Sequence, residues 1–191
     1  MFWPGMTHQI KTLINDCPPC NTYLSKQHAE KLPVTKTPEL PWIEVATDLF
    51  DYEGKHYILT VDYFSKYIDA DLLHDLSSAT TIEALKAQMS RHGIPEKLRN
   101  DKGPQYSSRE FTQFCQDYQI EHVSSSSHYA QSNGQAKRVV QTVKILWIKC
   151  KDKHHALLDY RTKPLESCKM SPTQKYTTNI TRFTEAALIR H

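Results

Sequence analysis

Three successive segments of the chain alternate between hydrophobic and polar positions. They are residues 43–50, 55–62 and 66–73, and Glu53-Gly54 supplies a turn between the first two. Because successive side chains of a strand point to opposite faces of a sheet, a period of two residues is typical of β-strands. The pattern predicts a three-stranded meander.

A helical period follows the meander. Residues 77–92 place Ile82, Leu85 and Met89 on one stripe, and Gly93 marks the end of this helix. The rest of the pattern predicts a strand at 97–101, a helix that Ser107 or Ser108 caps and that runs through 118, a strand at 122–125 and a long helix from Asn133-Gly134 to about 151. This order indicates an α/β fold with a five-stranded mixed sheet flanked by helices.

The first 41 residues lie outside this pattern and differ from it in residue spacing and composition. Ile10, Leu13 and Ile14 have helical spacing, and the Cys17-Pro-Pro-Cys20 segment follows them. A stretch rich in Lys, Pro and Thr comes next and reads as an extended linker. We therefore divide the chain into a helical segment at 1–25, a linker at 26–41, a core domain at 42–175 and a tail at 176–191.

Composition limits the classes of protein that fit. The chain has 191 residues, is 39% hydrophobic and 24% charged, and carries a formal net charge of +3, which suits a folded domain and permits a nucleic-acid partner without requiring one. No apolar run approaches the roughly 18 residues that span a bilayer, and the first residues lack the pattern of a signal peptide. The five cysteines are odd in number and scattered, which argues against a disulfide framework and favours a reducing compartment.

Two aspartates stand where predicted strands end. Asp48 lies near the end of the first strand, and Asp101 comes directly after the fourth. Acids at the ends of neighbouring strands can converge on a divalent metal, and phosphoryl-transfer enzymes use two such metals roughly 3.5–4 Å apart. The alternative is that each aspartate merely caps a strand or a turn.

With these acids in place, the order of short motifs resembles the integrases of gypsy-type LTR retrotransposons across essentially the whole chain. The motifs are Trp3-Pro4-Gly5-Met6, Cys17-x-x-Cys20, Asp48 in its strand, Val61-Asp62-Tyr63-Phe64-Ser65-Lys66-Tyr67, His92-Gly93-Ile94-Pro95, Asn100-Asp101-Lys102-Gly103-Pro104-Gln105-Tyr106, Gln131-Ser132-Asn133-Gly134-Gln135-Ala136, Tyr160-Arg161-Thr162 and Ser171-Pro172. The resemblance implies an RNase H-like core, Mg²⁺ or Mn²⁺ as cofactor, DNA as partner, a homo-oligomer and a nuclear location. In that family, two aspartates and one glutamate join element DNA to target DNA.

The third acid of the family is absent from this chain. The resemblance puts the glutamate on the long helix, at the position that Lys137 occupies here, with 35 residues between it and Asp101. No other Asp or Glu stands between Glu121 and Asp152. A protonated lysine cannot ligate a metal and repels one, so we expect strand transfer to be impaired. The ammonium either pairs with the two aspartates or points to solvent.

The cysteine pair Cys17 and Cys20 has the spacing of half a zinc site. The family supplies two histidines upstream of the Trp-Pro-Gly motif, where this chain begins. His8 and His28 are the nearby alternatives. Structural zinc sites almost always have four ligands, so we interpret residues 1–25 as a partial zinc-binding domain that holds Zn²⁺ weakly or not at all.

Basic residues gather on the long helix. At 100° per residue, Lys137, Lys144 and Lys151 share one stripe, and Arg138 adjoins it. Cations in a row contact phosphates and give binding that depends on salt but not on sequence. A solvated charged face is the alternative. The resemblance places the N-terminal part of this helix beside the DNA. Lys102, Gln105 and Tyr106 lie beside Asp101 and are candidates to hold the DNA end, and Tyr129 is a candidate for base stacking.

Three hypotheses follow from these observations. The chain is an active integrase that uses Asp48 and Asp101, a DNA-binding protein of retrotransposon origin with impaired chemistry, or a protein-interaction module on the same fold. Lys137 argues against the first, and the basic stripe argues against the third. The fold alone does not choose between them.

Overall fold

The computed structural model describes residues 4–16, 38–124, 134–166 and 168–177. It divides into two units, Met1–Lys36 and Thr37–His191, which are considered separately. In the first unit the predicted helical segment contains α1 (Met6–Asn15). The predicted linker lies largely outside the described residues, as do Cys17 and Cys20.

The second unit is built on a five-stranded sheet. Its strands are β1 (Glu44–Tyr52), β2 (Lys55–Asp62), β3 (Ile68–Leu73), β4 (Lys97–Asn100) and β5 (Glu121–Ser124), in the spatial order β3-β2-β1-β4-β5. The first three strands pair antiparallel, whereas β4 pairs in parallel with β1 and with β5. The predicted mixed sheet is confirmed.

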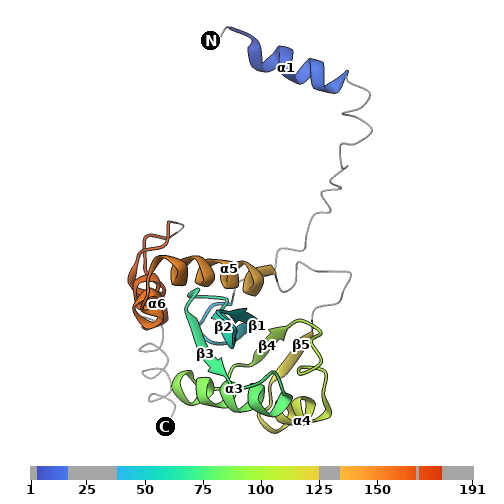
Figure 1. Ribbon diagram of the computed structural model, residues 1–191, viewed down its shortest axis with the longest axis vertical. Helices are drawn as coiled ribbons and strands as arrows, with labels where there is room; N and C mark the ends of the chain where they lie inside the picture. Colours follow the sequence, from blue (N-terminus) through green and yellow to red (C-terminus); the bar gives the residue numbers. More distant parts are fainter. Residues whose placement is uncertain (1–3, 17–37, 125–133, 167, 178–191) are drawn as a thin grey trace. The chain divides into compact units, whose positions relative to one another are not determined.

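Helices cover both faces of this sheet, as Figure 1 shows. The helices α3 (Ser78–His92) and α4 (Arg109–Asp117) pack on one face, and α5 (Gly134–Lys149) and α6 (Lys153–Thr162) pack on the other. In β1, Val45 belongs to the core under α3 and α4, whereas Ala46 and Phe50 belong to the core under α5 and α6. The alternation along β1 therefore links two separate hydrophobic cores.

Local sequence signals account for several of the boundaries. Ser77 caps α3 by accepting a hydrogen bond from the Thr80 N–H, and Ser108 caps α4 in the same way through Phe111. Glu53 and Gly54 have φ angles of 50° and 68°, which suits the two-residue turn between β1 and β2. None of the described helices combines the length and the apolar character that a bilayer-spanning segment requires.

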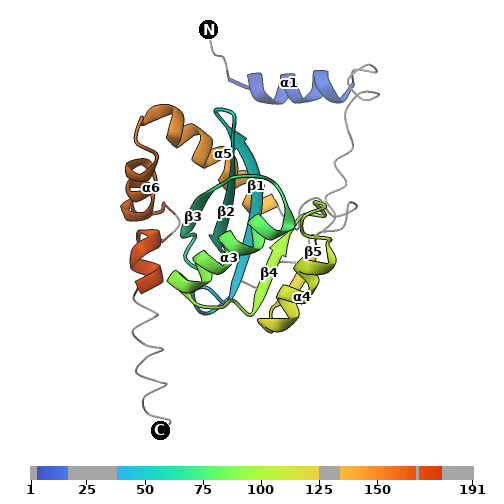
Figure 2. The same ribbon diagram turned by 60° about the horizontal axis from the view of Figure 1, so that its bottom comes forward.

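Two features differ from the sequence-based expectation. Helix α6 was not predicted, because only Ala156 and Leu157 are buried in a segment rich in histidine and charge. The third strand begins at Ile68 rather than at Lys66, because Lys66 has a φ of 65° and belongs to the turn. Figure 2 shows α6 beside the C-terminal end of α5, with α3 on the opposite side of the strands.

A buried carboxylate connects three elements at the β3 edge of the sheet. Asp69 on β3 is 7% exposed and accepts hydrogen bonds from Arg91 (2.9 Å) and His92 (2.8 Å) of α3 and from Arg161 (3.1 Å) of α6. Burial raises the pKa of Asp69, but these hydrogen bonds and the charges of both arginines outweigh it and hold the pKa well below its usual range. The carboxylate is therefore ionised and stabilises the native state at neutral pH.

We predict that Asp69→Asn lowers the free energy of unfolding by about 3–5 kcal/mol, because it removes the buried charge that pairs with Arg91, His92 and Arg161. Urea unfolding monitored by circular dichroism measures the loss. The matched control is Asp71→Asn, since Asp71 also pairs with Arg91 (2.6 Å) but its side chain is 30% exposed. Equal and small losses in the two variants would contradict a structural role for Asp69.

Candidate active site

Asp48 occupies a buried position in the central strand of the sheet. It lies on the same face of β1 as Ala46 and Phe50, which is the face that α5 covers. Only 8% of the residue is exposed, and its Oδ1 accepts a hydrogen bond from the Leu49 N–H at 3.1 Å. The carboxylate is thus held at the border between the core and the surface.

Asp101 reaches the same place from the neighbouring strand. Strand β4 pairs in parallel with β1, with Ala46 opposite Arg99. Two residues further along each chain, this register brings Asp48 level with Asp101. The Asp101 carboxylate accepts a hydrogen bond from the Gly103 N–H at 3.0 Å, which holds the side chain against its own loop. The sequence-based expectation that the two acids lie on adjacent strands agrees with this geometry.

The charges around Asp48 show which groups share the site. Burial raises the pKa of Asp48 to about 6, and the nearby charge of Asp101 acts in the same direction. The Leu49 N–H and the charges of Lys137 and Lys144 partly offset this rise. Two carboxylates and two lysines therefore interact where β4 ends beside β1.

Lys137 stands in the first turn of α5 and is exposed. It makes no ion pair with any carboxylate among the residues that the structure describes. Its charge is nevertheless close enough to lower the pKa of Asp48. Of the two expectations for this side chain, the structure therefore shows the solvent-exposed arrangement rather than direct pairing with Asp48 and Asp101.

The donor set does not fit a two-metal centre. The described residues contain no group of three or more His, Cys, Asp or Glu side chains that could hold a metal ion. Asp48 and Asp101 supply two carboxylates, and the resemblance puts the third ligand at the position that Lys137 occupies. Two metals at roughly 3.5–4 Å are held by oxygen ligands, which the ammonium groups of Lys137 and Lys144 cannot supply.

The loop after Asp101 is built tightly around its glycine. A Cβ at Gly103 would clash with the side-chain amide of Gln105 and would lie 3.1 Å from Oδ1 of Asp101. The Gln105 carbonyl accepts a hydrogen bond from the hydroxyl of Ser78 at the start of α3, at 3.0 Å. The Gln105 amide is the far end of a flexible side chain and can move away from a Cβ at Gly103, so the Ser78 contact is the one that places this loop. No local sequence signal links Ser78 to residue 105.

One expectation for the DNA-facing residues is wrong. Tyr106 is 1% exposed, packs edge-on against Phe111 and places its hydroxyl 3.5 Å from Oγ1 of Thr47. It supports the strands from within the core and cannot contact DNA directly. Lys102 is exposed and Gln105 is half-buried, so both remain available at the surface.

The basic stripe of α5 is shorter than the sequence suggests. Lys144 is half-buried, with its ammonium 5.7 Å from the centre of the Phe50 ring, and lies on the side of the helix that faces Asp48. Arg138 is exposed nearby. Helix α5 ends at Lys149, so Lys151 is an exposed residue beyond the helix. Two apolar side chains, Ile145 and Ile148, are also exposed on α5.

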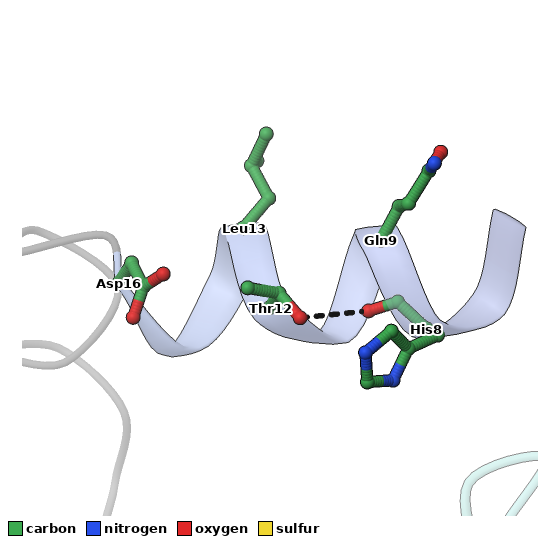
Figure 3. Close-up of a pocket in the computed structure, with 5 residues that line it drawn as sticks. All are labelled: His8, Gln9, Thr12, Leu13 and Asp16. Carbon is green, nitrogen blue, oxygen red and sulfur yellow. Dashed lines mark hydrogen bonds between the residues drawn. The ribbon is translucent and has the colours of Figure 1, made fainter. Parts of the chain in front are cut away.

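The first unit contains a hollow of about 770 Å³ along α1, lined by His8, Gln9, Thr12, Leu13 and Asp16. Figure 3 shows the Gln9 and Leu13 side chains on one side of the helix and the His8 ring on another. The Thr12 hydroxyl donates to the His8 carbonyl at 3.1 Å. Because these groups come from a single helix and do not converge, the hollow is not a candidate site. Cys17 and Cys20, for which we expect weak zinc binding or none, lie outside the described residues. Tyr129, the candidate for base stacking, also lies outside them.

Comparison with known proteins identifies what this arrangement resembles. Residues 45–130 match the Integrase core domain family. The chain is 34% identical over 145 residues to an uncharacterised protein, K02A2.6, of Caenorhabditis elegans, covering 75% of this chain and 11% of that protein. It is 29% identical over 137 residues to the Gag-Pro-Pol polyprotein of Simian retrovirus SRV-1, covering 71% and 8%. The chain spans about a tenth of the length of these curated relatives.

Solved structures show the same fold. The simian T-cell lymphotropic virus intasome in complex with PP2A regulatory subunit B56 gamma matches with a TM-score of 0.71 at 21% identity, covering 91% of this chain and 68% of that one. The HTLV-2 integrase catalytic core domain in complex with magnesium, in its dimeric form, matches with a TM-score of 0.59 at 24% identity, covering 72% and 98%. The mixed sheet with its flanking helices is thus the RNase H-like fold of integrase cores.

We predict that Asp48→Asn stabilises the chain when metal is chelated. Because the folded pKa of about 6 exceeds the unfolded value of about 3.9, the folded state binds more protons between about pH 4 and pH 6. Stability from this group is therefore present at acidic pH and declines as the pH rises through 6, at a cost on the order of 3 kcal/mol by pH 7.

The measurement is the free energy of unfolding in EDTA at pH 5 and pH 7.5. We expect a gain for Asp48→Asn of about 1–3 kcal/mol at pH 7.5 and a smaller gain at pH 5. Asp51→Asn, which neutralises an exposed carboxylate of the same strand, is the control. A gain that does not change with pH would show that the charge of Asp48 is not the cause.

Proposed function

Because this chain contains a retroviral-type integrase core domain, we propose that it binds DNA and is impaired in the polynucleotidyl transfer of its family. The observation that carries the proposal is Lys137, which stands in register with Asp48 and Asp101 where the resemblance expects glutamate. Retention of the fold supports binding, and loss of the third carboxylate supports impairment.

DNA binding is supported by the cations beside the acidic pair. Lys137 and Lys144 act on Asp48 from one side of α5, and exposed Lys102 follows Asp101 in the neighbouring loop. Phosphates of a DNA strand placed along this edge would meet several ammonium groups at once. Contacts of this kind give affinity without reading base sequence. One structural relative is itself part of an intasome.

The impaired chemistry follows from the donor set. One structural relative is a core domain in complex with magnesium, and a divalent metal in such a site stabilises charge that develops during phosphoryl transfer. In this chain, Asp48 and Asp101 remain, but the third position repels a cation. An active integrase that uses two aspartates alone would have to bind metal against Lys137 and Lys144, which makes this alternative the weaker one.

The remaining properties belong to the same proposal. We propose that this chain works in the nucleus, because chromosomal DNA lies there in a eukaryotic cell. One structural relative is a dimer in its solved form, so we propose that this chain also associates with copies of itself.

We predict that full-length chain binds duplex DNA with a strong dependence on salt. Each phosphate contact contributes about 0.9 to the slope of log affinity against log salt, so Lys137→Ala with Lys144→Ala should reduce the slope by about 2. Fluorescence anisotropy with one labelled duplex, titrated between low and moderate salt, measures both affinity and slope.

The control for this experiment is Lys86→Ala, which removes a cation from α3 on the other face of the sheet. It should leave the slope unchanged. If the α5 double variant keeps the wild-type slope, DNA binds elsewhere, and if the wild-type chain does not bind DNA at all, the proposed binding function is wrong.

We predict that the chain has no detectable Mg²⁺- or Mn²⁺-dependent end processing or strand transfer. A lost ligand in a two-metal site removes several kcal/mol of stabilisation from the transition state, and each 1.4 kcal/mol costs about tenfold in rate. Lys137→Glu should restore metal binding. The measurements are Mn²⁺ titration and an oligonucleotide strand-transfer assay, each carried out on the wild type and on Lys137→Glu side by side. Robust wild-type activity that Asp48→Asn abolishes would refute the impaired reading.

A further inference from the structure

The turn between β2 and β3, residues 63–67, gathers contacts from several parts of the second unit. Asp62 accepts hydrogen bonds from the N–H groups of Phe64 (3.3 Å) and Ser65 (2.9 Å), which shapes the turn from within. From outside, Lys175 donates to the Phe64 carbonyl at 2.7 Å, and the Tyr160 hydroxyl donates to the Lys66 carbonyl at 3.3 Å. The position of this turn is therefore fixed by groups distant in sequence.

Lys66 connects this turn to the helix that borders the acidic pair. Its ammonium donates to the Tyr63 carbonyl at 2.8 Å and to Oε1 of Gln135 at 3.2 Å. The φ of Lys66 is 65°, a left-handed conformation that residues other than glycine adopt at a cost. Its ammonium is also partly withdrawn from water, since burial and the nearby Lys175 lower the pKa of Lys66. These unfavourable features are compensated by the contacts that the side chain makes.

The partner of Lys66 stands in the first turn of α5, two residues before Lys137. Among the described residues, the side-chain amide of Gln135 accepts a hydrogen bond from Lys66 through Oε1. The Nε2 atom of the same amide is buried and has no hydrogen-bond partner among these residues. Next to it, Ala136 is completely buried in the core under α5. Among the described residues, burial of Ala136 and the charge-assisted hydrogen bond from Lys66 thus both hold the first turn of α5.

The direction in which Lys137 points depends on how this turn is held. Each residue of an α-helix advances the chain by 1.5 Å and rotates it by 100°. A shift of the helix by one residue relative to the sheet would therefore carry residue 137 away from Asp48. Buried Val140, Val143 and Trp147 hold the body of α5 against the sheet. In its first turn the buried side chain is Ala136, which is small and restrains that turn weakly, whereas the hydrogen bond to Gln135 fixes its direction.

We propose that Lys66 is a positioning residue, whose bridge from the Tyr63 carbonyl to Gln135 sets the azimuth of the first turn of α5 and so places residue 137 beside Asp48 and Asp101. The proposal rests on the proposed function only for its consequence, namely that residue 137 faces bound metal or DNA. The bridge acts through the helix and does not itself touch a substrate.

A purely structural role for Lys66 is the competing explanation, and the chain offers a matched control for it. Lys175 is a second lysine whose ammonium donates to a carbonyl of the same turn. If the turn merely needs a cation to be stable, Lys66→Met and Lys175→Met should have similar effects. If the bridge to Gln135 matters, only Lys66→Met should disturb α5.

The first measurement is hydrogen exchange by mass spectrometry on the full chain without metal or DNA. We expect Lys66→Met and Gln135→Met each to accelerate exchange in residues 134–140 about tenfold. The double variant should show no further increase, because the two substitutions remove the same hydrogen bond. Residues 78–92 should be unaffected. Lys175→Met should leave exchange in residues 134–140 within about twofold of the wild type.

The second measurement is Mn²⁺ affinity in the Lys137→Glu background, which reports on the position of residue 137 rather than on stability. Lys66→Met should weaken Mn²⁺ binding about tenfold, and Lys175→Met should change it less than about twofold. Equal effects of the two lysine variants, or unchanged exchange in residues 134–140 with Lys66→Met, would overturn the proposal. The exchange measurement uses neither DNA nor metal. Failure of the chain to bind DNA would therefore refute the proposed function, while the exchange measurement would still decide whether Lys66 positions α5.

Discussion

Hydrogen bonding of β1 along both of its edges is the constraint on which the rest of the second unit depends. Strand β1 pairs with β2 on one side and with β4 on the other, so it can neither slip nor tilt without breaking two ladders. A slip of one residue would also exchange its two faces and bury the wrong side chains. This register places Asp48 under the edge of α5, and the parallel pairing with β4 brings Asp101 level with it. The acidic pair is therefore a consequence of strand pairing rather than of local loop structure.

Several motifs that support the resemblance have structural roles in this chain. Within the segment 61–67, Asp62 is buried and organises the turn after β2 by accepting hydrogen bonds from its backbone. His92 packs against Trp42 with ring centroids 4.4 Å apart and donates a hydrogen bond to Asp69, which also accepts one from Arg161. These residues secure α3 and α6 against the β3 edge of the sheet. Family motifs thus mark the parts that hold the site in place as well as the site itself.

How far the sequence predicts the structure depends on the range of the interactions that matter. The strands and α3 to α5 follow from hydrophobic period and capping residues, which are local signals, and the acidic pair follows from strand order. The expectation for Tyr106 is wrong because closeness to Asp101 in sequence does not show which way the side chain faces, and tertiary packing buries it against Phe111. Helix α6 was missed for a similar reason, since Asp152 caps it but few of its residues are apolar. Contacts such as Lys66 with Gln135 join residues 69 positions apart and leave no local trace in the sequence.

The electrostatics of the acidic pair explain how such a fold persists without the third acid. The ionised form of Asp48 is already destabilised, because burial and the charge of Asp101 raise its pKa to about 6. A third carboxylate at position 137 would add repulsion that only a bound cation relieves. A lysine there supplies positive charge permanently, and the pKa of Asp48 is lowered by Lys137 rather than raised further. A lysine at position 137 therefore lets the two aspartates stay close together without a bound cation. The same positive charge is the reason for the impaired chemistry that we propose.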